Sequence, residues 1–177
     1  DKATSYIESP ATASKIKNVF PGAKIVICLR IPVQRALSNY FFSYNYGVET
    51  RSLEEVFLEE SEDPSVDLND FSSNPFAYIE RGLYSKYLPY YTDEFPSEQV
   101  LITFMEDFTT SKGLIEIFNF LGVTKLPRGI RPNTPVNESL RKSKVSDDIV
   151  SKLESYYYED AQKLIQTHNL TIPYAHT

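Results

Sequence analysis

The feature that most constrains this chain is a continuous apolar run, rich in β-branched residues, that lies between a turn and an arginine. The turn is Pro21-Gly22, the run occupies residues 24–29, and Arg30 follows it. A short run without polar alternation is typical of a strand that is buried on both faces of a parallel sheet. We therefore predict a central strand here, with Cys28 inside it as a small buried hydrophobic residue.

A helix is predicted directly after this strand. Pro32 stands where the first residue of a helix tolerates proline, and Gly47 stops the helical pattern. Between them, apolar residues recur at helical spacing: Ala36, Leu37, Tyr40, Phe41 and Tyr44. A strand, a turn and a helix thus follow one another directly.

The rest of the chain continues this alternation. The patterns predict a short helix from Ser52 to about residue 60, a long aromatic helix over about 75–93, a strand over 100–104, a helix over 111–121 and a last helix over 146–168. The acidic stretch 61–73 is expected to be an exposed loop. Since no repeat, low-complexity tract or linker divides the sequence, we expect a single domain over residues 1–177. Its predicted class is α/β, with a parallel β-sheet flanked by helices.

Composition argues against several kinds of partner and site. The net charge is −6, so no nucleic acid partner is expected. No apolar run approaches the ~18 residues of a membrane span, and Asp1-Lys2-Ala3-Thr4 does not open a signal peptide. We expect a cytoplasmic protein without a membrane span, with a lumenal domain of a larger protein as the alternative. A chain of 177 residues can bury a sizeable core, so it needs no disulfide or metal, and we expect no metal.

The strand, turn and helix at residues 24–40 suit an anion. Ligands of open α/β sheets bind outside the carboxyl ends of strands, where the next helix offers unpaired backbone N–H groups. Arg30 stands at that end and can donate two parallel hydrogen bonds to a phosphate. Ser38 lies about two turns into the helix, on the face that it shares with Arg35 and Phe42. A phosphate that bridges Arg30 and Ser38 is the expected ligand; the alternative is an arginine that pairs with a surface carboxylate and a serine that is merely exposed.

These residues resemble the 3′-phosphate motif of the sulfotransferase family. In that motif a strand ends in Arg, and Pro, Arg-Ala, Ser and Tyr follow at fixed spacing; here they are Arg30, Pro32, Arg35-Ala36, Ser38 and Tyr40. Later stretches resemble the same family in the same order: ERGLY (80–84), FP (95–96), QVLI (99–102), EDF (106–108) and IFNFLGV (117–123). The resemblance covers nearly the whole chain, and bacterial and carbohydrate-type members are the most similar in kind.

The resemblance implies a fold, a donor substrate and the residues that hold the donor. The fold is the C-terminal part of the P-loop-NTPase-like sulfotransferase fold. The donor is 3′-phosphoadenosine 5′-phosphosulfate (PAPS), and adenosine 3′,5′-bisphosphate (PAP) is the product; Arg30 and Ser38 would hold the 3′-phosphate of both. Because family members bring a late loop over the nucleotide, Arg141 or Lys142 would also reach that phosphate, with a solvated basic surface as the alternative.

Two positions depart from the family pattern. Ile31 replaces the Asp or Asn that usually lies between the Arg and the Pro, which should alter loop packing rather than phosphate contact. Met105 stands where many cytosolic members have a tyrosine near the adenine, and its thioether can still cover a ring face. For Glu106 and Asp107 we expect a capping role at the helix that follows the second strand.

The catalytic groups of sulfuryl transfer are only partly represented. The reaction needs cations around the bridging oxygen and a base for the acceptor proton. In the family, a lysine-containing loop after an N-terminal strand supplies most of these cations; we find no such loop and expect a preceding segment or a second chain to complete the site. Lys2 lies in a stretch that resembles the Glu-Lys-Thr/Ser-Pro-Ser-Tyr of carbohydrate-type members, so it would neutralise the transferring sulfuryl group; a frayed terminal lysine is the alternative. The catalytic His of cytosolic members is replaced by Thr4, which excludes a His base there.

Two functions are left open by the sequence. The first is a sulfotransferase, an enzyme that moves a sulfuryl group from PAPS to a hydroxyl or amine of a small-molecule or carbohydrate acceptor. The second is a truncated, non-catalytic module of the same fold that binds the nucleotide or a second chain. An unrelated nucleotide-binding domain, such as a kinase fragment, is disfavoured because no Gly-Lys-Ser/Thr turn follows a strand.

Overall fold

A computed structural model describes residues 5–59, 61–65, 74–108, 110–123, 144–168 and 170. The chain divides into two compact units, which are described separately: residues 1–30 with 87–137, and residues 31–86 with 138–177. The division into two units does not test the single domain that we expected from the sequence, which stays a prediction.

The first unit contains two parallel strands, β1 (Ile25–Leu29) and β2 (Val100–Phe104). Their register places Ile25 opposite Val100 and Leu29 opposite Phe104. Because the strands run in parallel, their carboxyl ends meet at the same edge of the sheet. Both strands lie where the sequence predicted them.

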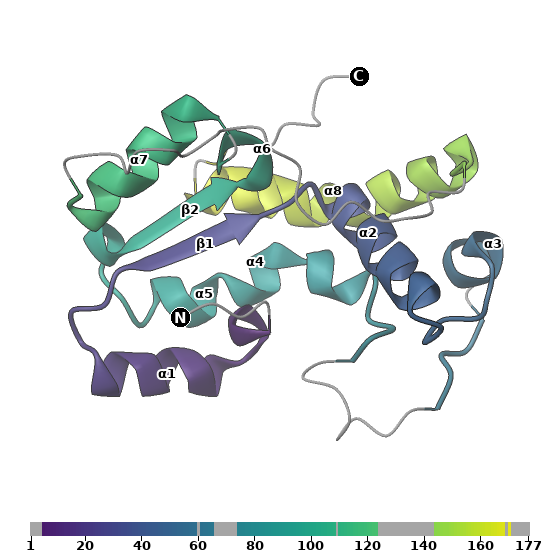
Figure 1. The fold of residues 1–177 in the computed structure, drawn as a ribbon, viewed down its shortest axis with the longest axis horizontal. Coiled ribbons are helices and arrows are strands. Elements are labelled where there is room, and N and C mark those ends of the chain that lie inside the picture. The colour runs from purple at the N-terminus through teal and green to yellow at the C-terminus, as the bar shows by residue number, and fades with distance from the viewer. Residues whose placement is uncertain are drawn as a thin grey trace. The chain divides into compact units, whose positions relative to one another are not determined.

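Helices lie on opposite sides of these two strands. Figure 1 shows α1 (Pro10–Val19) and α5 (Pro89–Thr92) on one side and α7 (Ser111–Leu121) on the other. The short elements of this unit are η1 (Tyr6–Glu8), η4 (Ser97–Gln99) and α6 (Met105–Phe108). The predicted class is confirmed: the fold is α/β, with parallel strands flanked by helices.

The prediction for Cys28 is wrong, because this side chain is exposed. Its neighbours Ile27 and Leu29 are 8% and 2% exposed. Successive strand residues point to opposite faces of a sheet, so Cys28 lies on the face opposite to that of these two core residues. Within the described residues β1 has one paired neighbour, β2, and only one face of β1 is fully packed.

The second unit is a set of helices around an aromatic core. Its elements are α2 (Pro32–Asn45), α3 (Leu53–Phe57), η3 (Glu80–Gly82), the start of α4 (Tyr84–Tyr87) and α8 (Asp147–His168). The helices α2 and α3 both pack against α8. Their shared core consists of Val33, Ala36, Tyr40, Phe41, Leu53, Phe57, Phe76, Tyr78, Ile149, Leu153 and Tyr157.

Local signals in the sequence fix the ends of these helices. Pro32 begins α2, and Gly47, with φ of 73°, follows its end. A capping box begins α3: the Ser52 N–H donates to Glu55 Oε2 at 2.6 Å, and the Glu55 N–H donates to Ser52 Oγ at 3.2 Å. Gly122, with φ of 79°, ends α7 in the same way as Gly47 ends α2.

The long aromatic helix predicted over 75–93 is wrong. In its place the chain forms η3, α4 and α5, with Gly82 in the first and Pro89 beginning the last. A Cβ added at Gly82 would lie 2.8 Å from the Tyr157 hydroxyl, so the backbone here is packed directly against that ring. Pro89 lacks the N–H that a continuous helix would need. The aromatic spacing reflected burial in separate short turns rather than one helix.

No helix within the described ranges is long and apolar enough to cross a membrane.

Candidate functional site

Arg30 is the first residue after β1. The last strand residue, Leu29, is almost fully buried, and Arg30 is half-buried. At the other end of the strand, Lys24 donates to the Phe120 carbonyl and lies over the Phe120 ring, 5.1 Å from its centroid. The two cations that bound β1 therefore differ in role: Lys24 ties the strand to α7, whereas Arg30 stands at the carboxyl end, where ligands of α/β sheets bind.

Met105 lies at the same end of the sheet. Leu29 is paired with Phe104, so Arg30 and Met105 are the residues that directly follow the paired strands. Met105 is 45% exposed at the start of α6. The structure thus brings Arg30 and Met105 to one edge of the first unit, where a thioether can cover a planar ring.

The start of α2 has no side-chain cap. Ile31 precedes the helix and offers only its carbonyl, which accepts the Arg35 N–H at 2.8 Å. Pro32 has no N–H to satisfy. The other N–H groups of the first turn have no helical acceptor, and the positive end of the helix dipole favours an anion.

Ser38 lies on α2, in the second unit, two turns from the start of the helix. The residue is half-buried, and its hydroxyl makes no hydrogen bond to any described residue. Residues three or four apart share a face of a helix, so Ser38 shares one with Arg35 and Phe42. A hydroxyl in this state can donate to a ligand without breaking a bond inside the protein.

The motif residues next to Ser38 are used within the fold. Arg35 donates to the Tyr78 carbonyl and to Asn39 Oδ1, each at 2.9 Å. Arg81 donates to the same Asn39 oxygen at 3.3 Å. Tyr40 is buried, which raises its pKa to about 12. These contacts hold α2 against the aromatic segment and leave Ser38 as the polar group of the motif that is open to a ligand in this unit.

Sequence reasoning assigned no role to Asn39 or Arg81. Arg81 lies in a stretch that carries the family resemblance, and Asn39 lies between two motif residues. The available signal for a polar contact was the position of Arg81 in an aromatic stretch of the sequence. A guanidinium among apolar side chains needs acceptors for its N–H groups. The sequence did not indicate which acceptor it would be.

A second polar cluster follows α2. Glu49 is 1% exposed, and its carboxylate accepts from the backbone N–H groups of Thr50 and Arg51, from the Arg51 guanidinium at 2.7 Å and from the Tyr78 hydroxyl at 3.0 Å. Burial alone raises the pKa of Glu49, but the hydrogen bonds from Arg51 and Tyr78 hold it below its usual range. Glu49 is therefore charged and saturated, which makes it unsuitable as a general base.

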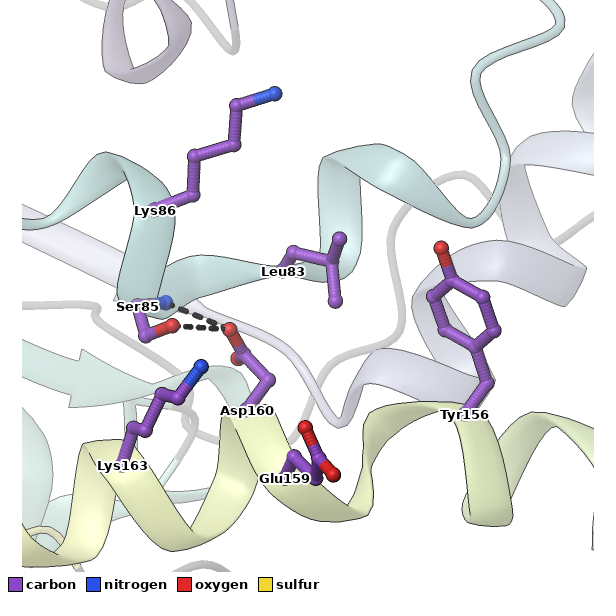
Figure 2. Close-up of a pocket in the computed structure, with 7 residues that line it drawn as sticks. All are labelled: Leu83, Ser85, Lys86, Tyr156, Glu159, Asp160 and Lys163. Atoms are coloured by element: carbon purple, nitrogen blue, oxygen red, sulfur yellow. Dashed lines mark hydrogen bonds between the residues drawn. The ribbon is translucent and has the colours of Figure 1, made fainter.

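A cavity of about 330 Å³ lies between α8 and the segment that begins α4 (Figure 2). One oxygen of the buried Asp160 accepts from the Ser85 N–H at 3.1 Å and from the Ser85 hydroxyl at 2.5 Å. The other oxygen is buried and makes no hydrogen bond to any described residue. The lining consists of Leu83, Ser85, Lys86, Tyr156, Glu159, Asp160 and Lys163. None of the predicted site residues is among them, and Asp160 serves as a cap for α4.

Three predicted site residues, Lys2, Arg141 and Lys142, lie outside the described residues, and their contacts stay predictions. Of the two histidines, His168 ends α8 and His176 also lies outside. No group of His, Cys, Asp and Glu that could hold a metal ion is found in the part of the chain that the structure describes.

The fold is similar to that of a solved bacterial sulfotransferase. The crystal structure of a sulfotransferase from Alicyclobacillus acidocaldarius matches with a TM-score of 0.72 and 26% sequence identity, over 94% of this chain and 63% of that chain. This chain therefore spans less than two thirds of the length of that protein. No protein-family model matches the sequence, and no curated protein matches it. The structural similarity supports the sulfotransferase-like fold that the sequence resemblance predicted.

Proposed function

We propose that this chain binds PAPS and takes part in sulfuryl transfer to a hydroxyl or amine. The observation that carries the proposal is the motif itself: Arg30 directly after β1, a start of α2 that no described side chain caps, and Ser38, whose hydroxyl bonds to no described residue. A fold similar to that of a sulfotransferase supports the same reaction class. Fold similarity alone would not suffice, because function depends on the site.

Each residue has a defined role in this proposal. Arg30 donates to the 3′-phosphate of the donor, and Ser38 donates a further hydrogen bond to the same group. Met105 covers a face of the adenine. Arg141 or Lys142 adds charge to the 3′-phosphate. All of these contacts are made to PAPS before the reaction and to PAP after it, so they position the donor and do not take part in bond breaking.

The reaction breaks one S–O bond and forms another. The bond between the sulfur and the oxygen of the 5′-phosphate breaks, the acceptor oxygen or nitrogen bonds to the same sulfur, and the acceptor proton passes to a base. Negative charge builds on the oxygen that leaves with PAP, and a cation is needed there. We assign that cation to Lys2. The acceptor is a small molecule or a carbohydrate, and a preceding segment or a second chain completes the site. We also propose a cytoplasmic location.

A non-catalytic nucleotide-binding module is the second candidate. Both candidates need the 3′-phosphate contact, but only the enzyme converts PAPS to PAP when an acceptor is present. Incubation with PAPS and a panel of hydroxyl and amine acceptors, followed by measurement of PAP, separates the two.

The donor site is tested by comparing PAP with adenosine 5′-monophosphate, which lacks the 3′-phosphate. We expect PAP to bind at least tenfold more tightly in calorimetric titrations, because a charge-assisted hydrogen bond contributes about 1.5–3 kcal/mol. Equal affinities for the two nucleotides would contradict the proposed contact. Binding of neither would contradict the proposal as a whole.

A further inference from the structure

Asp160 on α8 is a buried carboxylate of which only one oxygen is bonded within the described chain. The residue is 6% exposed. Its Oδ1 accepts from the Ser85 N–H at 3.1 Å and from the Ser85 hydroxyl at 2.5 Å. Its Oδ2 is also buried and accepts from no described residue. Because a buried, charged acceptor without a donor destabilises a fold, Oδ2 is a group that a bound ligand can satisfy.

The contact with Ser85 does not account for the negative charge at position 160. Both donors of Ser85 are bonded to Oδ1 alone. The side-chain oxygen of an asparagine could accept the same two bonds. The second oxygen and the charge are therefore left over after the role of Asp160 at the start of α4 is accounted for.

Asp160 lines the cavity between α8 and the segment that begins α4, and this cavity lies wholly within the second unit. Its volume of about 330 Å³ is within the range of small-molecule sites. Figure 2 shows the Ser85–Asp160 pair on one side of the view and the Tyr156 ring on the other, with Leu83 between them. The lining thus offers polar acceptors on one side and apolar surface on the other.

The charges around the cavity favour a ligand with one positive charge. Lys86 is paired with Glu80, so these two side chains are neutral together. Glu159 and Asp160 carry two negative charges and Lys163 carries one positive charge, which leaves one negative charge in excess. No ion pair joins Lys163 to either carboxylate in the part of the chain that the structure describes. A monocation would balance the cavity.

We propose that this cavity binds a small organic amine in its ammonium form, with the –NH₃⁺ group on a short apolar body. The ammonium donates to Asp160 Oδ2 and to the Ser85 hydroxyl, whose own proton is donated to Oδ1. The apolar body lies against Leu83 and the Tyr156 ring. An ammonium fits better than a guanidinium, because a single oxygen cannot accept both bonds of the planar fork. This site is independent of the proposed function.

Lys163 controls access to the buried oxygen. In Figure 2 its side chain extends toward the Ser85–Asp160 pair. Lys163 is exposed and makes no hydrogen bond or ion pair with a described residue, so its side chain can turn away without breaking a contact of that kind. An amine that enters the cavity then supplies the donor that Oδ2 lacks.

The test uses the whole chain and three compounds that share a phenylethyl body: phenethylamine, phenethyl alcohol and phenylalanine. Titrations followed by proton–nitrogen NMR observe the Ser85 amide, which donates to Asp160. We expect phenethylamine to shift this signal and to bind at least tenfold more tightly than the other two compounds. The reason is that only the amine brings a net positive charge to the carboxylate.

Asp160→Asn keeps the oxygen that accepts from Ser85 and removes the charge. It should weaken amine binding at least tenfold, and circular dichroism checks that the fold survives. Glu154→Gln is the matched control, because it makes the same chemical change at an exposed position of α8 outside the cavity. This variant should bind the amine as the wild type does. Lys163→Met removes a like charge beside the ligand and should tighten binding about threefold.

Three outcomes would overturn the amine site. The first is that phenethylamine leaves the Ser85 signal unmoved. The second is that the alcohol or phenylalanine binds as tightly as the amine. The third is that folded Asp160→Asn binds the amine like the wild type. If Asp160→Asn does not fold, Lys163→Met decides: tighter binding supports the site, and weaker or unchanged binding overturns it. PAP binding, measured separately by calorimetry, reports on the proposed function alone.

Discussion

Two polar regions of the second unit differ in how far their side chains are buried and hydrogen-bonded within the fold. Around Glu49, the carboxylate is 1% exposed and accepts hydrogen bonds from Arg51 and Tyr78. Along the outer face of α2, the Ser38 hydroxyl makes no hydrogen bond within the described part of the chain, and the Phe42 ring is 60% exposed. We call these the closed cluster and the open face.

The comparison teaches that residue type alone does not assign a role. A buried carboxylate that is paired with its hydrogen-bond donors contributes to the stability of the fold. Removing it leaves the partner charge buried and unpaired, which is costly. The Ser38 hydroxyl, which bonds to no described residue, and the exposed Phe42 ring contribute little to folding, since they lose few contacts when the chain unfolds. The closed cluster should therefore govern stability and the open face should govern binding.

The largest effect is expected for Glu49→Ala. The substitution leaves the Arg51 guanidinium, 11% exposed, without its main partner, and should lower the free energy of unfolding by about 3 kcal/mol. Urea unfolding measures this. Glu54→Ala, at an exposed position of α3, is the control and should stay within about 0.5 kcal/mol of the wild type. A Glu49 variant as stable as its control would remove the distinction between the two regions.

Ser38→Ala tests the open face. It should weaken PAP binding by about 1.5–3 kcal/mol, because a hydrogen bond to a charged phosphate is lost, and leave stability unchanged. Ser43 on the same helix is the matched serine: it is buried and donates to the Pro75 carbonyl at 3.2 Å. Ser43→Ala should instead cost about 1 kcal/mol of stability. If thermal melts and calorimetry gave the two variants the same profile, the open face would have no special role.

Gly82→Ala probes the packing that supports the closed cluster. The new methyl group would lie 2.8–2.9 Å from atoms of the Tyr157 ring, so one of the two must shift. Overpacking of this kind costs about 1–3 kcal/mol. Gly22→Ala meets nothing within 4 Å and serves as the control. Equal unfolding midpoints for the two variants in urea would show that the Tyr157 ring adapts without cost.

The smallest effect is a pH dependence of stability. The pKa of Glu49 is held below its ordinary value of 4.5 in the folded chain, so the unfolded state binds a proton first as the pH falls. The stabilisation from Glu49 is therefore complete above about pH 4.5 and is lost as the pH falls through the folded pKa. Glu49→Gln should flatten the stability profile in this range. A variant profile parallel to that of the wild type would assign the acid sensitivity to other carboxylates.

Much of this fold was predictable because its signals are local. The strand after Pro21-Gly22, the capping box at Ser52 and the stop at Gly122 each depend on a few adjacent residues. The broken helix after residue 75 was not predictable in this way. Its form depends on Tyr157, a residue far away in the sequence, which packs against Gly82 and donates to the Ile79 carbonyl at 2.9 Å.

In the candidate site, too, features with local signals could be predicted and contacts between residues far apart in the sequence could not. Arg30 and Ser38 could be predicted as site residues because their spacing after a strand has a local physical meaning, and their role in binding stays a prediction. The contacts of Arg35 and Arg81 with Asn39 were not, because the partners come together only after folding. The prediction that Cys28 is buried was wrong for a related reason. An apolar run indicates a strand but does not reveal which of its faces is covered.

The central claim is that Arg30 holds the 3′-phosphate of the nucleotide. The most direct test is calorimetric titration of the chain with PAP at physiological salt, beside Arg30→Ala and the control Lys112→Ala, which removes an exposed positive charge from α7. The account predicts that Arg30→Ala loses about 2–4 kcal/mol of binding free energy, the scale for a phosphate left without its guanidinium, while Lys112→Ala binds as the wild type does. An unchanged PAP affinity in Arg30→Ala would contradict it.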